Sequence, residues 1–89
     1  MIKKSVTIGL ADGLEARPIA MLVQTATKFS SSVYLDVENK RVNAKSIMGL
    51  MMLAAEFGSF VTLTTNGSDE KEAFDTIKNL FDNKFNEEF

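Results

Sequence analysis

Apolar residues in this chain follow two different periods in turn, and this alternation constrains the fold more than any other feature. Apolar residues alternate in segments 2–10, 33–37 and 61–65, which is typical of half-buried strands. Lys4 interrupts the first of these patterns, and the last ends in Thr65. A turn at 38–40 leads into a short strand around Val42. Helical spacing marks three further segments, at 18–29, 46–57 and 69–85. The predicted element order is therefore β-α-β-β-α-β-α.

The predicted strands each have one apolar and one polar face. Val33, Leu35 and Val37, for example, alternate with polar or half-polar neighbours. Such strands fit an antiparallel sheet that helices cover on a single side. We expect an α+β fold with a four-stranded antiparallel sheet and three helices on one face. A length of 89 residues suits one small domain, so residues 1–89 are predicted to form it alone.

Composition excludes several classes of function. The net charge of −2 argues against general nucleic-acid binding, which needs a basic surface. The chain has no cysteine and no histidine, so we expect no disulfide framework, no metal site and no cofactor. Residues 1–5 lack the apolar core of a signal peptide, and the apolar stretch 47–55 is too short to span a bilayer. We expect a cytoplasmic bacterial protein.

Two short motifs carry most of the functional information. The first is Gly-Leu-Glu-Ala-Arg-Pro-Ile-Ala at 13–20, and the second is Val-Asn-Ala-Lys-Ser-Ile-Met-Gly-Leu at 42–50. Proline suits the first position of a helix, so Pro18 predicts a helix that begins near Arg17. The free amides and the positive dipole end of that helix would face Glu15, which places a fixed carboxylate in an anion site.

Together, at this spacing, the two motifs resemble those of HPr, the histidine-containing phosphocarrier family of the bacterial sugar phosphotransferase system. The resemblance runs without a gap through most of the chain and implies an open-faced sandwich. In that family a histidine stands where this chain has Glu15. A chain that keeps the regulatory serine and lacks the histidine resembles the Crh-type branch, although those chains usually carry glutamine at this position.

The resemblance assigns Glu15 to the position that carries phosphate in the family, and it leaves several interpretations open. Glu15 and the neighbouring Arg17 are not expected to be catalytic. Glu15 either imitates a phosphorylated histidine beside Arg17 or simply favours the helix start. As an alternative, Glu15 could relay a phosphoryl group as an acyl phosphate.

Ser46 matches the family's regulatory phosphorylation site. On its own, a serine directly before an apolar helix is read as an N-cap. A phosphate there would also be stabilised by the free amides and the dipole of the helix, so both roles are compatible. The resemblance implies that HPr kinase/phosphorylase adds and removes this phosphate, with Lys45 and Arg17 as candidates to neutralise it. Arg17 could instead pair with Glu15, and the alternative to both roles is a solvated arginine on a first helical turn.

The helix after Ser46 is too apolar to have one ordinary wet face. At about 100° per residue, Gly49, Leu50 and Leu53 share one side, and Ile47, Met48 and Met51 share the other. Only one side can face the sheet, so the other predicts an exposed partner surface, unless all these residues belong to the core. The predicted partner-binding set is Arg17, Ala20, Lys45, Ile47, Met48 and Met51. In the family, the corresponding surface meets enzyme I, the kinase and catabolite control protein A.

The sequence thus predicts a regulatory protein without catalytic activity of its own, switched at Ser46 and acting as a corepressor-type partner of catabolite control protein A. A phosphocarrier using Glu15 and a constitutive interaction module are the alternatives. Crh-type chains can exchange their first strand, so a monomer and a strand-exchanged homodimer are both compatible. Phe81 and Phe85 fit the core stripe of the last helix, whereas Phe89 lies in a tail of undecided role.

Overall fold

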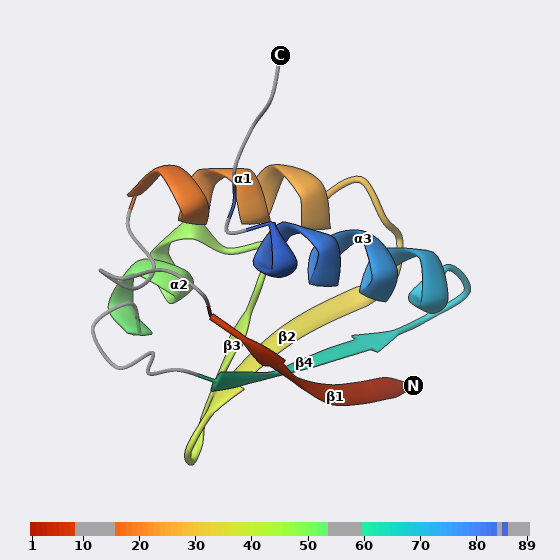
Figure 1. The fold of residues 1–89 in the computed structure, drawn as a ribbon, viewed down its shortest axis with the longest axis horizontal. Helices are drawn as coiled ribbons and strands as arrows, with labels where there is room; N and C mark the ends of the chain where they lie inside the picture. Colours follow the sequence, from red (N-terminus) through yellow and green to blue (C-terminus); the bar gives the residue numbers. More distant parts are fainter. Residues whose placement is uncertain (9–15, 54–59, 84, 86–89) are drawn as a thin grey trace.

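The computed structural model describes residues 1–8, 16–53, 60–83 and 85. Within these residues, seven elements follow one another in the predicted order (Figure 1). They are β1 (Ile2–Thr7), α1 (Ala16–Ala26), β2 (Ser32–Val37), β3 (Lys40–Asn43), α2 (Ile47–Leu53), β4 (Phe60–Asn66) and α3 (Glu70–Asp82). The predicted strand at 2–10 ends at Thr7, and the predicted continuation of α2 to residue 57 falls in 54–59, outside the described residues.

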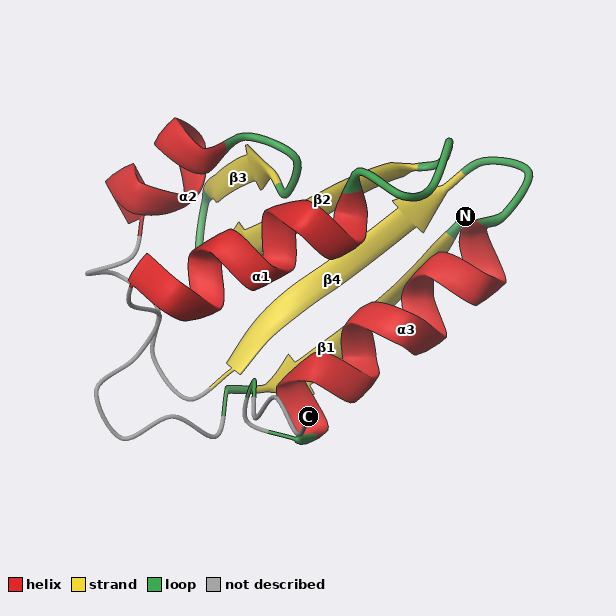
Figure 2. Cartoon of the chain, turned by 90° about the horizontal axis from the view of Figure 1, so that it is seen from above, coloured by secondary structure: helices red, strands yellow, loops and turns green. Residues whose placement is uncertain are grey.

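The four strands form one sheet in the order β1-β4-β2-β3, and every neighbouring pair is antiparallel. β1 and β2 therefore run parallel with β4 between them, and α1 connects them as a crossover. β3 and β4 are related in the same way through α2. All three helices lie on one face of the sheet, with α3 along β1 and α2 beside β3 (Figures 1 and 2). This arrangement confirms the predicted antiparallel sheet with a single helical layer.

The core lies between the sheet and the helices and follows the predicted periodicities. In β2 and β4 every second side chain is buried against the helices, as strand geometry requires. These side chains are Val33, Leu35, Val37, Val61, Leu63 and Thr65. The helices contribute apolar side chains three or four positions apart. They are Ile19, Leu22 and Ala26 from α1 and Ala73, Phe74, Ile77 and Phe81 from α3.

The first helix begins one residue earlier than predicted, at Ala16, so Pro18 is its third residue rather than its first. A proline is still acceptable there, because the first four amides of a helix have no partner within the helix. The position of Pro18 therefore supports the predicted helix start to within the usual uncertainty of one or two residues.

Asp69 directly precedes α3 and stands three residues before Glu72, a spacing that predicts an N-terminal capping pair, but this prediction is wrong. The Asp69 side chain makes no capping hydrogen bond to the helix. Its carboxylate instead accepts the backbone N–H of Ser30 at 3.0 Å, the N–H of Ser31 at 2.9 Å and the Ser31 hydroxyl. These bonds lower the pKa of Asp69 to about 2, the Ser31 hydroxyl having the largest effect and the Ser30 amide the next. Asp69 therefore joins the start of α3 to the segment that enters β2.

The turn before Asp69 packs directly against the same segment and requires glycine. A Cβ on Gly67 would lie 2.7 Å from the Cα of Ser31, and the backbone φ of Gly67 is +152°. The Gly67 N–H donates to the Glu70 carboxylate at 3.2 Å, and the terminal amine of Met1 pairs with the same carboxylate at 2.8 Å. The start of α3 is thus bonded to the start of β1 as well as to the entrance of β2.

The last helix ends sooner than its apolar stripe. α3 stops at Asp82, and Phe85 reaches the core from the turn that follows, with φ +54° and its N–H donating to the Leu80 carbonyl at 2.8 Å. Its ring meets that of Phe81 edge to face, with the ring centroids 4.9 Å apart. The prediction that Phe81 and Phe85 belong to the core is confirmed, although only Phe81 is helical. Phe89 lies outside the described residues.

We expect Asp69→Asn to lower the melting temperature at neutral pH and to flatten its acid dependence. The folded-state pKa of Asp69 is depressed, so its contribution is complete above the unfolded-state value of about 4 and is lost as the pH falls toward 2. Thermal unfolding followed by circular dichroism from pH 7 to pH 2 measures both effects.

Asp75→Asn is the matched control, because Asp75 lies on the same helix and pairs with the exposed Lys71, at 3.2 Å. A surface pair of this kind contributes little to stability, so its melting profile should stay close to that of the native chain. An Asp69→Asn profile that fell with acid as steeply as the native one would contradict the role assigned to Asp69.

Candidate functional site

Helix α2 buries one side and exposes the other, as its sequence predicts. Leu50 is fully buried in the core. Four apolar side chains are exposed: Ile47 at 49%, Met48 at 76%, Met51 at 60% and Met52 at 78%. We call these four residues the α2 strip. The hypothesis that the whole helix belongs to the core is therefore wrong, because a helix packed along the edge of the molecule can bury only one of its sides.

Met52 is the one member of the α2 strip that the sequence analysis missed. It lies four residues after Met48 and hence only about 40° further around the helix. The same angular argument that grouped the other three could have included it. The sequence analysis therefore left out the most exposed side chain of the α2 strip.

Ser46 begins α2 as its N-cap. Its Oγ accepts the backbone N–H of Gly49 at 3.1 Å, and its carbonyl accepts the N–H of Leu50 at 3.1 Å. A Cβ on Gly49 would lie 3.3 Å from Ser46 Oγ, so glycine leaves space beside the hydroxyl. The predicted capping role is confirmed, and it places a hydroxyl at the end of the helix that carries the α2 strip.

The residues before Ser46 hold the helix start in place. Asn43 accepts the N–H of Lys45 through its side-chain Oδ1 at 2.8 Å, and its carbonyl accepts the Ser46 N–H at 3.0 Å. The Lys45 ammonium donates to the carbonyl of Phe29 at 2.8 Å, just after α1. Lys45 is therefore engaged by the fold, and neutralising a phosphate on Ser46 would require it to share or leave this bond.

The first turn of α1 supplies the other predicted site residues. Arg17 is exposed, and Ala20 lies one turn later, partly buried. Residues three apart share a helix face, so these two belong to one surface of α1. Helix α1 packs against α2 (Figure 2), which brings the two motifs of the sequence to neighbouring elements. Glu15 lies outside the described residues.

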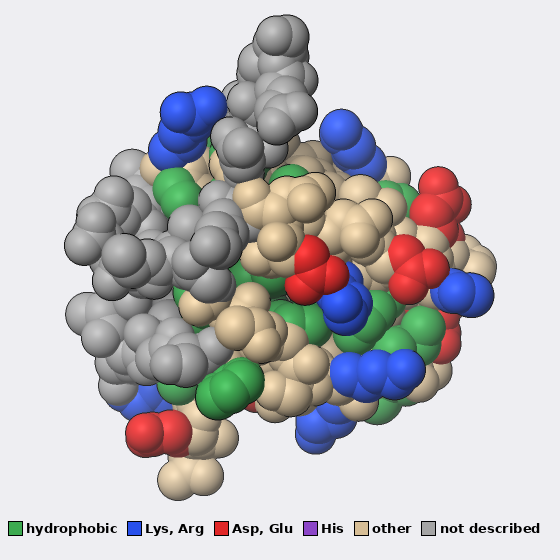
Figure 3. Space-filling view, in the orientation of Figure 1, with side chains coloured by type: hydrophobic (Ala, Val, Ile, Leu, Met, Phe, Trp, Pro, Cys, Tyr) green, Lys and Arg blue, Asp and Glu red, His purple; other side chains and the backbone are tan. Residues whose placement is uncertain are grey.

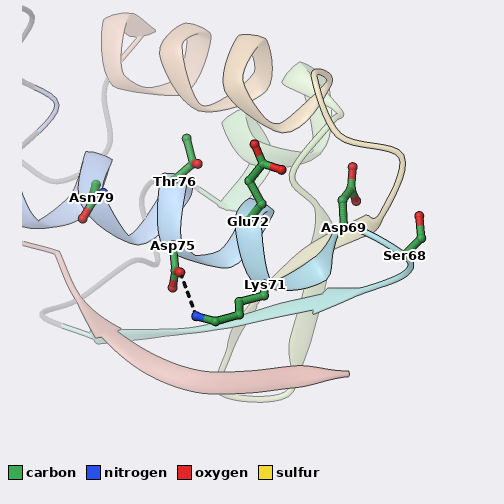
Figure 4. Close-up of a pocket in the computed structure, with 7 residues that line it drawn as sticks. All are labelled: Ser68, Asp69, Lys71, Glu72, Asp75, Thr76 and Asn79. Carbon is green, nitrogen blue, oxygen red and sulfur yellow. Dashed lines mark hydrogen bonds and ion pairs between the residues drawn. The ribbon is translucent and has the colours of Figure 1, made fainter.

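A polar groove along α3 lies apart from these elements and offers no comparable site. Its carboxylates diverge: Asp75 pairs with Lys71 on one side of the helix, and Glu72 points away from that pair (Figure 4). Within the described residues, no group of three or more His, Cys, Asp or Glu side chains could hold a metal ion. Among those residues there is also no helix long and apolar enough to cross a membrane.

Positively and negatively charged side chains of the described residues are interspersed on the surface and do not form separate patches. On the face shown in Figure 3, lysine and arginine side chains lie among aspartate and glutamate side chains. This distribution agrees with the small net charge of −2 and produces no single-sign field on that face. The α2 strip therefore differs from this mixed polar surface in chemistry, because four large apolar side chains are exposed along one short helix.

Comparison with known proteins identifies relatives for nearly the whole chain. The family model described as "PTS HPr component phosphorylation site" matches residues 2–83. HPr-like protein Crh of Halalkalibacterium halodurans is 49% identical over 77 residues, which cover 86% of this chain and 92% of that protein. The family model describes a component of the phosphotransferase system, and the relative is an HPr-like protein; neither is an enzyme. This agrees with the function class expected from the two motifs.

Solved structures of similar proteins share the fold. HPr-C-His from Thermoanaerobacter tengcongensis matches with a TM-score of 0.90 and 46% identity, covering 100% of both chains. Crh of Bacillus subtilis, described as a dimer with a swapping domain, matches with a TM-score of 0.73 and 45% identity, covering 94% of this chain and 97% of that one. The resemblance predicted from the two motifs and the open-faced sandwich are both confirmed.

We expect substitutions on the two sides of α2 to differ sharply in their effect on stability. Leu50→Ala empties a fully buried position and should lower the free energy of unfolding by about 2–5 kcal/mol. Met52→Ala removes a side chain that is 78% exposed and should change it by no more than about 0.5 kcal/mol. Urea unfolding measures both, and comparable losses from the two variants would contradict the division of the helix into a buried and an exposed side.

Proposed function

The chain belongs to the HPr family of the phosphotransferase system, and we propose that within it this protein is a regulator switched by phosphorylation of Ser46. In this proposal HPr kinase/phosphorylase modifies Ser46, and the phosphorylated chain acts in the cytoplasm as a corepressor-type partner of catabolite control protein A. The protein itself catalyses no reaction.

The observation that carries the proposal is the position of Ser46 relative to the α2 strip. The serine hydroxyl lies at the helix start, and the exposed residues Ile47 and Met48 follow it directly. A phosphoryl group on Oγ adds a charge of about −1.5 to −2 at neutral pH. The modification would therefore place a strong anion at the edge of an apolar surface.

The helix start is compatible with that anion. The first amides of α2 and the positive end of its dipole favour negative charge at this position. Gly49 leaves space beside the hydroxyl, because it has no side chain in contact with Ser46 Oγ. Phosphorylation would then add charge without unfolding the helix, so its effect would be on partner binding rather than on the fold.

A partner that recognises the phosphorylated chain needs two complementary features. Basic groups would pair with the phosphate, and an apolar surface would cover the α2 strip. Methionine side chains suit such contacts because they repack against surfaces of different shape. Arg17 and Ala20 on the neighbouring helix α1 would extend the same interface. The partner-binding set proposed is Arg17, Ala20, Lys45, Ile47, Met48 and Met51, with Met52 added.

The loss of histidine supports regulation over phosphate transfer. Transfer by HPr proteins depends on an imidazole, and this chain contains none. In the interpretation of Glu15 as a phosphohistidine mimic, its fixed charge would accompany the switch at Ser46. The proposal holds for a monomer and for a strand-exchanged homodimer, because α2 and Ser46 come after β1 in the chain and need not move with it.

A phosphocarrier that uses Glu15 is the second candidate, because among solved structures the chain resembles HPr-C-His about as closely as it resembles Crh, at 46% and 45% identity. In this candidate the Glu15 carboxylate would accept a phosphoryl group from enzyme I as an acyl phosphate.

Incubation with HPr kinase/phosphorylase and ATP should add one phosphoryl group to the native chain and none to Ser46→Ala or Ser46→Asn, as measured by intact mass. Asparagine is the matched control, because it keeps a good N-cap but cannot be phosphorylated. Ser46→Ala should lose about 1 kcal/mol of stability with the cap, whereas Ser46→Asn should lose little.

Only the phosphorylated native chain should then bind catabolite control protein A in a titration. If Ser46→Asn bound the regulator as tightly as the phosphorylated chain, the switch would be wrong, since the variant retains the fold and the cap but lacks the phosphate. Tight binding of the unmodified native chain would favour the constitutive interaction module.

Incubation with phosphoenolpyruvate and enzyme I tests the second candidate. We expect no phosphoryl adduct, because the carboxylate of Glu15 is already anionic and smaller than the imidazole that such a site accommodates. An adduct that hydroxylamine removes, and that is absent from Glu15→Gln, would instead establish an acyl-phosphate carrier.

A further inference from the structure

All the sulfur in this chain is in methionine, and most of it is exposed in one place. The chain has five methionines and no cysteine, so thioethers are its only sulfur groups open to oxidation. Three of the five, Met48, Met51 and Met52, lie in the seven-residue helix α2. Each is between 60% and 78% exposed; of the other two, Met1 before β1 is 72% exposed and Met21 in α1 is 8% exposed.

The methionines on the exposed side of α2 are apolar, but they also differ chemically from other apolar residues because they can be oxidised. Leucine has a similar helix propensity and a similar volume, and it occupies the buried side at Leu50. Ile47, the remaining member of the α2 strip, cannot be oxidised in this way. The helix therefore presents an apolar surface of which three of four side chains can change polarity without any change in sequence.

We propose that Met48, Met51 and Met52 form an oxidation site that switches off the docking surface next to Ser46. The class of co-reactant is a peroxide, and the product is methionine sulfoxide. The consequence for docking rests on the proposed function, because it requires that a partner cover the α2 strip. The oxidation itself depends only on exposure.

The chemical step is a two-electron transfer of oxygen. The Sδ lone pair attacks one oxygen of hydrogen peroxide, the S–O bond forms and the O–O bond breaks. The departing hydroxide then takes the proton from the transferred oxygen, which leaves sulfoxide and water. Sulfur is oxidised and the peroxide is reduced, so no further reactant is needed. Methionine sulfoxide reductases provide the class of reaction that restores the thioether.

Oxidation should act on the interface and leave the fold intact. A sulfoxide adds a strong hydrogen-bond acceptor, which an apolar partner surface would bury without a donor. Leu50, which fixes the helix to the core, faces the other way and is unchanged. The Ser46 cap on Gly49 also involves no sulfur. The oxidised chain therefore remains folded but presents a polar α2 strip.

The test oxidises the Ser46-phosphorylated chain with hydrogen peroxide, removes the peroxide with catalase, and measures sulfoxide at each methionine by peptide mass spectrometry. Binding to catabolite control protein A is then titrated. We expect Met48, Met51 and Met52 to be oxidised well before Met21, and affinity to fall by about tenfold or more, the scale of one buried unsatisfied acceptor. Circular dichroism should show the same melting transition before and after treatment.

Two variants separate this site from general damage. Met48→Leu/Met51→Leu/Met52→Leu keeps the surface apolar but cannot form sulfoxide, so its binding should resist peroxide. Met21→Leu is the matched control and should lose binding as the native chain does. Equal oxidation of Met21 in the folded chain, unchanged affinity of the oxidised native chain, or peroxide-sensitive binding by the triple variant would each overturn the proposal.

The proposed function and this inference fail in distinguishable ways. If the phosphorylated chain binds the regulator equally well with thioethers and with sulfoxides, only the inference fails. If the unoxidised chain is phosphorylated but does not bind the regulator, the proposed partner is wrong. The inference is then tested by the rates at which the kinase phosphorylates the oxidised and the unoxidised chain. Equal rates overturn the inference. A chain that the kinase does not phosphorylate even before oxidation overturns both.

Discussion

Strand β4 is the constraint on which the rest of the structure depends. It lies between β1 and β2 and pairs with both, so Leu63 stands in register with Lys4 on one side and Leu35 on the other. Because β1 and β2 are neighbours of β4 and not of each other, only pairing with residues 60–66 holds the two ends of the crossover through α1 in one sheet. The crossover through α2 also ends on β4. Both crossovers lie on the same side of the sheet, which is why a single layer of helices covers a single face.

The exposed strip on α2 is a consequence of where this topology puts the helix. α2 packs against α1 and β3 at one edge of the sheet, so there is no element to cover its outer side among the described residues. A helix of seven residues would not form alone in water, and its stability must come from its surroundings. Leu50 in the core, the Ser46 cap and the Asn43 bonds supply it. The same contacts that make the helix fold also fix the position of the serine hydroxyl beside the strip.

Periodicity was sufficient to predict the order of the elements and the buried faces, because burial against one helical layer imposes a local pattern on each strand and helix. It could not predict bonds between distant segments. Asp69 resembles a helix cap in sequence, yet its carboxylate bonds Ser30 and Ser31, 39 and 38 residues away. The hydrogen bond from Lys45 to the Phe29 carbonyl could not be predicted for the same reason. At the site, the cap at Ser46 and the exposure of Ile47, Met48 and Met51 followed from local geometry, whereas Met52 was missed although its angle on the helix placed it with them.

The proposed switch gains specificity from the proximity of two unlike chemistries. An apolar strip alone binds any apolar surface of suitable shape, and a phosphate alone binds any basic pocket, so neither selects a partner by itself. The hydroxyl of Ser46 caps α2, and the thioethers of the strip follow in the same helix at Met48, Met51 and Met52, so a partner must satisfy both to bind. Phosphorylation would supply the missing charge, and sulfoxide formation would remove the apolar component, so the two modifications would act on the same contact in opposite directions. A surface of this kind answers to two signals without any conformational change in the fold that carries it.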